Sequence, residues 1–254
     1  NAKTKEGLNT SISMSKEIQK DIKALNKKML QKKNIGWEEK QKIKAILKKQ
    51  QELEKKIADT QKKNSENLKN KEKLNSSIIE KQKKLEELMK QVLDEEMQKL
   101  LNEIDKMMDS AKTEKLKELL EKLNAENQDL EKELDRELEL FKQLEFEQKL
   151  EEILEKINAL KKQQEKLKDK TEGNKKDKEG KLVTEQEKLN KKMDEVKKEL
   201  QILRKKNAEL EEKNEMPKTQ KLENSIQEKM QESQDALEKG KKNKSKKAQQ
   251  DVID

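Results

Sequence analysis

The residues of this chain that could take part in chemistry are its carboxylates and its lysines. Asp and Glu together number 55 and Lys and Arg 63, whereas the chain has no cysteine, histidine or tyrosine. Paired carboxylates can act as general acid and base or hold a divalent cation. Here they recur at the spacing of ion pairs with lysine on a helix surface. The pattern therefore predicts solvated helix faces, and we expect no enzyme, no metal site and no cofactor.

A second candidate for chemistry is the stretch KTEGNKKDKEGK at residues 170–181. A phosphate-binding loop needs two glycines five residues apart, then a lysine followed by Ser or Thr. Gly173 and Gly180 lie seven residues apart, and Leu182 follows Lys181. The stretch also contains no apolar residue. We therefore interpret residues 170–181 as a polar linker and predict no nucleotide site.

The charge of the chain says little about its partners. The formal net charge is +8, but acidic and basic residues are mixed along the whole length. Arg136 and Arg204 are the only arginines, so almost all of the positive charge comes from lysine. Lysine cannot form the bidentate hydrogen bonds by which arginine recognises bases and phosphates. Aromatic residues, on which bases stack, make up 1% of the chain. We expect no specific nucleic acid as a partner.

The elements that position these charges are helices. Charged residues make up 46% of the chain, which leaves little for a globular core. Leu, Ile and Met recur three and four residues apart among good helix formers. We expect an all-α chain of extended antiparallel helical hairpins and coiled coil with a small helix bundle and no β-sheet. No apolar run approaches the roughly 20 residues that span a bilayer. The chain begins at Asn1 without a signal-like segment, and we expect it to be part of a larger protein.

Interruptions of the apolar pattern divide the chain. Chain reversals are expected near 33–36 and between 109 and 128, where the polar interval NAENQD occupies 124–129. Pro217 forbids helix continuation. The expected segments are an N-terminal helix and hairpin turn (1–36), a long helix with a possible bend near 93–96 (37–112), helices of a thicker bundle (113–169), the linker (170–181), a coiled-coil helix (182–216), a C-terminal helix (217–240) and a disordered basic tail (241–254).

Two apolar lines are expected to form packing seams between helices. The first is Leu134, Leu138, Phe141 and Leu144, which departs from a strict heptad and so predicts contact with more than one neighbour. The second is a heptad run, in which a core Asn would fix the register. Its members are Leu189, Met193, Val196, Leu200, Leu203, Asn207 and Leu210.

The few aromatic residues are candidates for packing or for partner contact. We interpret Trp37, beside the turn at Asn34-Ile35-Gly36, as a packing wedge at the hairpin corner; an exposed partner anchor is the alternative. Phe141 lies on its seam, and we expect it to be buried. Phe146 lies off that line and is the better candidate to face a partner.

The lysines near the C-terminus are a further candidate contact surface. They lie in the run KKNKSKKAQQ, which we expect to be a solvated tail that could alternatively contact an anionic surface. The candidate partner-facing lysines are Lys241, Lys242, Lys244, Lys246 and Lys247.

Several stretches resemble the helical region of a family of very large Bacteroidota proteins that carry a domain of unknown function and predicted N-terminal transmembrane helices. The resemblance runs roughly from residue 15 to 250 and is carried mainly by DLEKELDRELELFKQLEFEQKLEE and by the segment after Pro217. It implies a helical segment on the periplasmic side of the cell envelope, tethered by membrane helices outside this sequence. It implies no activity and no catalytic residue.

One local motif bears on the same compartment. Asp109-Ser110-Ala111 is similar to the short motif for O-glycosylation of exported proteins in that bacterial group, and a helix cap and turn is the competing interpretation of Ser110. Together these features favour a non-enzymatic scaffold or spacer in a membrane-anchored envelope protein, with protein partners or self-association through its helices. The alternative is a basic coiled coil that binds an anionic polymer or a membrane surface.

Overall fold

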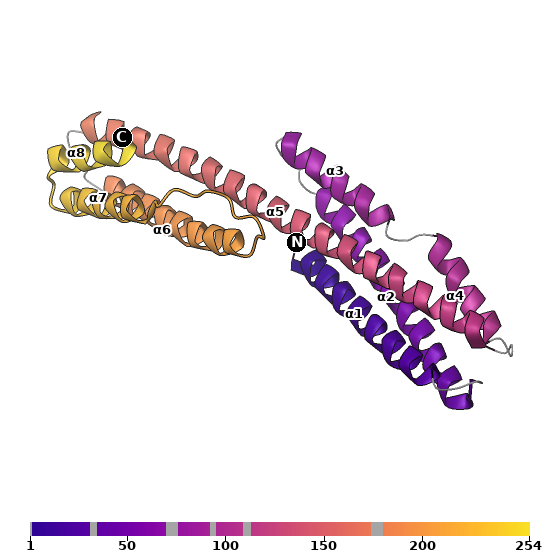
Figure 1. Ribbon diagram of the computed structural model, residues 1–254. Coiled ribbons are helices and arrows are strands. Elements are labelled where there is room, and N and C mark those ends of the chain that lie inside the picture. Colours follow the sequence, from indigo (N-terminus) through magenta and orange to yellow (C-terminus); the bar gives the residue numbers. More distant parts are fainter. Residues whose placement is uncertain (1, 31–34, 70–75, 92–94, 109–112, 174–179) are drawn as a thin grey trace. The chain divides into compact units, whose positions relative to one another are not determined.

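The computed structural model describes residues 2–30, 35–69, 76–91, 95–108, 113–173 and 180–254. These residues form helices and contain no strand, which confirms the all-α fold class (Figure 1). Two compact units are present, unit 1 (Asn1–Glu145) and unit 2 (Phe146–Asp254). The helices are α1 (Ala2–Met29), α2 (Trp37–Lys69), α3 (Ser76–Gln91), α4 (Glu95–Met107), α5 (Thr113–Gly173), α6 (Lys181–Ala208), α7 (Gln220–Glu238) and α8 (Lys242–Ile253).

Helices α1 and α2 of unit 1 form an antiparallel pair (Figure 1). Near the turn, the Lys28 ammonium lies 3.7 Å from the Glu38 carboxylate. Farther along, the Lys49 ammonium lies 2.7 Å from Asp21. Toward the other end, Gly7 packs on Thr60, and a Cβ at position 7 would clash with the Thr60 hydroxyl and stand 2.8 Å from its methyl carbon. The two helix backbones approach closely there because position 7 has no side chain.

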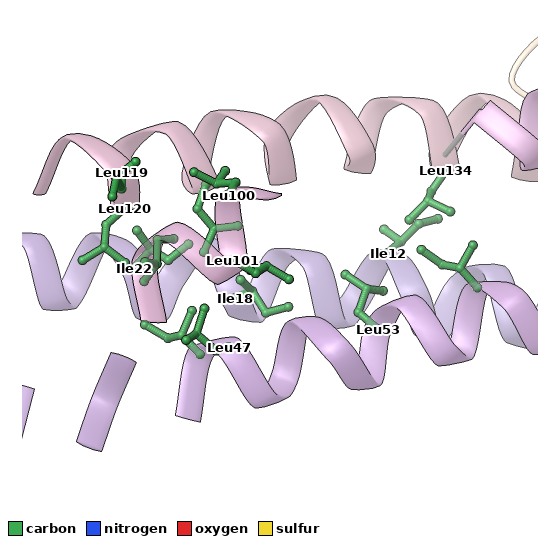
Figure 2. Packing of buried hydrophobic residues seen from close by; sticks show 14 of the residues in the cluster. Ile12, Ile18, Ile22, Leu47, Leu53, Leu100, Leu101, Leu119, Leu120 and Leu134 are labelled. Atoms are coloured by element: carbon green, nitrogen blue, oxygen red, sulfur yellow. The ribbon is translucent and has the colours of Figure 1, made fainter. Parts of the chain in front are cut away.

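The core of unit 1 collects apolar residues from every helix that contributes to the unit. Figure 2 shows Ile18 and Ile22 of α1 and Leu101 of α4, which belong to this core together with Leu53 of α2. The seam residues predicted on α5 all belong to this core; they are Leu134, Leu138, Phe141 and Leu144. The predicted burial of Phe141 is therefore confirmed, with 4% of its surface exposed.

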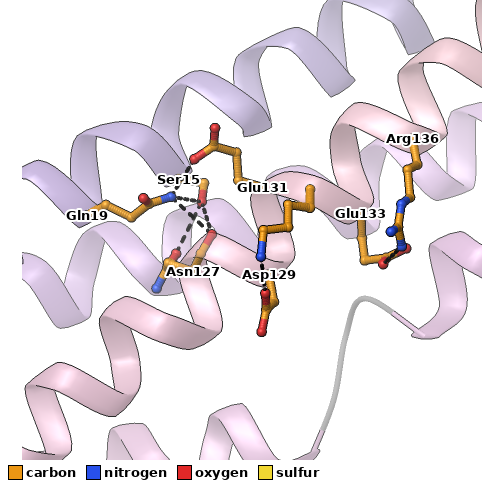
Figure 3. Close-up of polar contacts among 8 residues, drawn as sticks. Ser15, Gln19, Asn127, Asp129, Glu131, Glu133 and Arg136 are labelled. Atoms are coloured by element: carbon orange, nitrogen blue, oxygen red, sulfur yellow. Dashed lines mark hydrogen bonds and ion pairs between the residues drawn. The ribbon is translucent and has the colours of Figure 1, made fainter.

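Helix α5 runs without interruption through the polar interval at 124–129, so the reversal expected between 109 and 128 is not made by that interval. Residues 109–112, including Ser110, lie outside the described residues. Asn127 is buried, and its backbone oxygen accepts hydrogen bonds from Ser15 (2.9 Å) and Gln19 (3.1 Å) of α1 (Figure 3). The polar residues that suggested a break instead join two helices, because tertiary hydrogen bonds outweigh weak helix propensity.

The prediction of a single long helix over 37–112 is wrong. Helices α2, α3 and α4 are separate elements, and α3 packs against α2. The expected bend at 93–96 coincides with the start of α4 at Glu95, although residues 92–94 lie outside the described residues. The physical reason is burial, because Ile78 and Leu85 of α3 belong to the same apolar core as Leu53 and Ile57 of α2, and a straight continuation of α2 would leave them in solvent.

Within the described residues, unit 2 contains the last part of α5 followed by α6, α7 and α8. The linker expected at 170–181 is shorter in the structure, because α5 continues to Gly173 and α6 begins at Lys181. Gly180 precedes α6 with φ 62°, a left-handed conformation that favours glycine. Residues 174–179 between the helices lie outside the described residues.

The coiled-coil helix expected over 182–216 ends early, at Ala208, well before Pro217. Asn207 does not act as a register residue between helices. Its side-chain amide donates to the Asn214 backbone oxygen, and its amide oxygen accepts the Asn214 backbone N–H, both at 2.8 Å. Leu210 is buried beside Phe146. These contacts stabilise a non-helical return of the chain, and the helix expected at 217–240 begins only at Gln220.

The basic tail expected at 241–254 is helical, which corrects the prediction of disorder. Gly240 has φ 67°, and the Lys241 N–H bonds the Ala236 oxygen at 2.7 Å. The Gly240 N–H also bonds the Leu237 oxygen at 3.0 Å, which completes the glycine-dependent end of a helix known as a Schellman motif. This turn directs α8 back onto α7, where Ala248 is buried.

Candidate functional site

The described residues contain no group of three or more acidic side chains placed to hold a metal ion. Gly173 and Gly180, the glycines closest in pattern to a phosphate loop, terminate α5 and precede α6. The remaining candidates for a functional site are surfaces that could bind another molecule.

Polar contacts fix an antiparallel, up-down-up-down order of the helices in unit 2. Along α5 and α6, the Lys170 ammonium lies 2.7 Å from Glu185 and the Lys156 ammonium 2.5 Å from Glu199, so the numbering runs in opposite directions. On the other side of α6, Asn190 donates to the Gln234 side chain of α7 at 2.8 Å. Helices α5 and α7 thus run in one direction and α6 in the other.

Helix α8 occupies the fourth position, between α5 and α7. The Lys168 ammonium of α5 donates to the Gln250 side chain at 2.9 Å, and Lys246 forms an ion pair with Glu172. Toward α7, the Asp251 carboxylate lies 3.4 Å from the Lys229 ammonium. Helix α8 is therefore parallel to α6 and closes one half of a four-helix arrangement.

A buried amide at the closed half connects all four helices. The Gln186 side chain of α6 exchanges hydrogen bonds with Gln164 of α5 at 3.0 and 3.1 Å. Its oxygen also accepts from Ser233 of α7 at 2.9 Å and from Gln249 of α8 at 3.1 Å. The Ser233 and Ser245 hydroxyls are 2.9 Å apart. Because buried polar groups are costly unless they are bonded, this cluster fixes the register of α8.

Beyond the end of α8, unit 2 has an apolar groove of about 420 Å³. Its α5 wall and α7 wall expose apolar side chains, most clearly Leu154 (51% exposed), Ile157 (39%) and Leu222 (61%). Every α5 residue from 154 to 159 is exposed, between the buried Ile153 and Leu160. Helix α5 thus packs through a narrow seam here. The floor of the groove is formed by α6, through Met193, Val196, Leu200 and Leu203.

A charged cluster supports one end of the groove. Arg204 of α6 forms an ion pair with Glu223 of α7 and donates to the Thr219 hydroxyl at 2.7 Å. Burial by itself would raise the pKa of Glu223, but the hydrogen bonds from Arg204 and Thr219 hold it below its usual value. This carboxylate is therefore charged at neutral pH, and it fastens the start of α7 to α6.

Most seam residues predicted from the heptad run lie where the sequence placed them. Leu200 is half-buried and lines the groove. The others, Asn207 apart, are buried in unit 2; they are Leu189, Met193, Val196, Leu203 and Leu210. The sequence pattern did not separate Leu154 and Leu222 from the core. The only available signal was the adjacent pair Ile153-Leu154, since one helix face rarely buries both.

Two predictions about aromatic residues are wrong. Trp37, the first residue of α2, is 77% exposed and therefore does not pack into the hairpin corner. The start of α2 is instead fixed by a capping contact, in which the Gly36 N–H donates to the Glu39 carboxylate at 2.9 Å. Phe146, expected to face a partner, is 4% exposed and packs with Ile153 and Val196.

Two of the lysines proposed as partner-facing form ion pairs within unit 2. Lys244 lies 3.2 Å from Glu232, and Lys246 pairs with Glu172. Lys241 and Lys247 are exposed, and Lys242 is half-buried. The structure therefore does not gather these side chains into one free basic surface.

Comparison of the chain with protein-family models, with curated proteins and with solved structures finds no match.

Proposed function

We propose that this chain is a non-enzymatic scaffold or interaction segment that binds another protein through the groove of unit 2. The observation that carries the proposal is the exposed apolar lining, with Leu154, Ile157 and Leu222 all accessible to solvent. Contiguous apolar surface of this kind marks interaction sites on soluble domains. The ion pairs of Lys244 and Lys246 with acidic neighbours favour a protein partner over an anionic polymer.

We further propose that the segment works in the cell envelope, on the periplasmic side, as part of a membrane-anchored protein. The support is the resemblance of its helical stretches to the Bacteroidota family described above. Within the described residues, no helix combines the length and the apolar character required to cross a bilayer. A membrane anchor, if it follows the pattern of that family, belongs to segments outside this sequence.

The proposal is tested by site-specific photo-crosslinking of the full-length protein in native membranes. A benzophenone amino acid replaces Leu154 in the groove or, as a control, the exposed Glu118 of unit 1. We expect a discrete protein adduct from position 154 and none from position 118. A second substitution, Leu222→Glu on the opposite wall, should abolish the adduct. Equal labelling from both positions, or no adduct from the groove, would refute the proposal.

A further inference from the structure

Unit 1 carries an excess of positive charge at the end where α1 and α2 meet. Residues 20–49 contain eleven lysines and three acidic residues, an excess of eight charges that equals the net charge of the whole chain. The rest of the chain is therefore balanced. We call the described part of this segment, residues 20–30 and 35–49, the hairpin end. The end of α4 and the start of α5 lie at the same end of unit 1 (Figure 1) and carry equal numbers of acidic residues and lysines, which are Asp105, Lys106, Glu114, Lys115, Lys117 and Glu118.

The three acidic residues of the hairpin end already have partners within the chain. Asp21 and Glu38 form the ion pairs described above, and the Glu39 carboxylate accepts the Gly36 N–H. These carboxylates therefore do not offset the remaining lysines. Lysines on both helices are exposed, among them Lys23, Lys27 and Lys44. Their positive charge can attract an external anionic partner.

Two large apolar side chains are also exposed at the hairpin end. Leu30, directly after α1, is 74% exposed, and Trp37, the first residue of α2, is 77% exposed. The ion pair between Lys28 and Glu38 joins the two helix ends on which these side chains stand. Exposed apolar surface and excess positive charge thus occur together at one end of unit 1.

This combination matches the interface of an anionic bilayer. A tryptophan ring prefers the headgroup level, and lysines lay their stems along apolar surface while their ammonium groups reach the lipid phosphates. Peripheral membrane contact of this kind combines an apolar and an electrostatic contribution, and the hairpin end has both. A nucleic acid could pair with the lysines and stack on Trp37, but it offers the aliphatic Leu30 no apolar surroundings.

We infer that the hairpin end of unit 1 docks on the surface of a membrane that contains anionic lipids. Trp37 and Leu30 enter the headgroup region, and Lys27 and Lys44 pair with lipid phosphates. The contact is peripheral and involves no spanning helix. It goes beyond the proposed function, because the groove of unit 2 takes no part in it.

The chain contains one tryptophan and no tyrosine, so its intrinsic fluorescence reports on position 37 alone. The full chain is mixed with vesicles made of equal parts of phosphatidylcholine and phosphatidylglycerol. We expect the Trp37 emission to shift to the blue and to be quenched by lipids brominated in their acyl chains. Vesicles of phosphatidylcholine alone should give no shift, and high salt should abolish it, because the attraction of lysines to anionic lipids is electrostatic and screened.

Substitutions at the hairpin end locate the contact. Lys27→Glu combined with Lys44→Glu should weaken binding to the mixed vesicles, measured by co-sedimentation, by at least about tenfold. The control, Lys241→Glu combined with Lys247→Glu, makes the same change of charge at exposed lysines of unit 2 and should bind like the parent chain. Leu30→Ser should weaken binding by roughly tenfold, since an apolar side chain no longer leaves water. Circular dichroism verifies that these exposed changes leave the helices intact.

Four results would overturn the inference. Equal binding to vesicles with and without phosphatidylglycerol would exclude a role of the lysines. Co-sedimentation without any change in the Trp37 emission would place the contact elsewhere on the chain. Loss of binding in the control pair, with none in the hairpin pair, would assign it to the C-terminal lysines. An emission change with a single-stranded oligonucleotide and none with vesicles would assign the hairpin end to nucleic acid. The crosslinking test at Leu154 is independent of all four.

Discussion

Glu137 is a buried carboxyl group whose ionisation opposes folding of unit 1. It lies on α5 with no exposed surface, and neither carboxylate oxygen has a hydrogen-bond partner among the described residues. Burial, and to a lesser extent the negative charge of Glu133, raises the pKa of Glu137 from 4.5 to about 8. A carboxylate in such a place is costly unless it is paired or protonated. We therefore expect Glu137 to be protonated in the folded chain at neutral pH.

The sign of the pH dependence follows from the two protonation equilibria. Well below pH 4.5 the folded and the unfolded chain both carry the proton, so titration of Glu137 does not change the free energy of unfolding with pH. Between pH 4.5 and about 8 the unfolded chain ionises while the folded chain keeps the proton, so the free energy of unfolding falls with rising pH. At 1.36 kcal/mol per pH unit, this interval corresponds to about 5 kcal/mol.

The test substitution is Glu137→Gln, which keeps the shape of the protonated side chain and removes its titration. The free energy of unfolding is measured by urea denaturation from pH 5 to pH 9, with Glu121→Gln, at an exposed position of the same helix, as the control. We expect Glu137→Gln to gain stability relative to the parent chain as the pH rises, by about 3 to 5 kcal/mol between pH 5 and pH 8. The control should follow the parent.

Parallel curves for the parent chain and Glu137→Gln would refute this reasoning. They would mean that the carboxylate is ionised in the folded chain and that solvent or a cation reaches it. A gain that is constant over the pH range would instead assign the effect to packing of the amide, since packing does not titrate.

Four further substitutions test the packing described above. Gly7→Ala should destabilise the α1–α2 pair by about 1 to 3 kcal/mol in thermal unfolding, and Thr60→Ala in the same chain should recover most of the loss by removing the clash. Phe146→Ala should cost about 3 to 5 kcal/mol and lower hydrogen-exchange protection in unit 2, whereas an exposed Phe146 would show almost no effect. Gln186→Leu should cost at least about 2 kcal/mol in urea denaturation, because its partners on three helices lose their hydrogen bonds; an unchanged midpoint would contradict the role of this amide.

The sequence by itself determined the helical class and most of the buried positions. Spacings of three and four residues define one apolar face of a helix whatever that face packs against, so Leu134, Phe141 and Leu203 could be assigned to a core without knowledge of their neighbours. Glycine conformation is similarly local. Gly180 and Gly240 mark helix boundaries because a positive φ is costly for other residues.

Only the tertiary structure decided where polar residues interrupt a helix and where they join two helices. The interval at 124–129 looked like a turn, yet Asn127 is buried and bonded to Ser15, a residue far away in the sequence. The tail after Gly240 looked disordered, yet α8 packs on α7 through small and polar side chains such as Ser245. Their stabilising partners are remote in sequence, so no local pattern reveals them.

The groove, too, could be recognised only in the tertiary structure. Leu154 and Leu222 carry the same apolar signal as their buried neighbours, because helical periodicity reports which face is apolar and not whether another helix covers it. Coverage depends on the length of α8, which stops at Ile253 while α6 runs on beneath the groove. A difference in length between two helices that meet only in the folded chain thus converts core-like residues into an exposed binding surface.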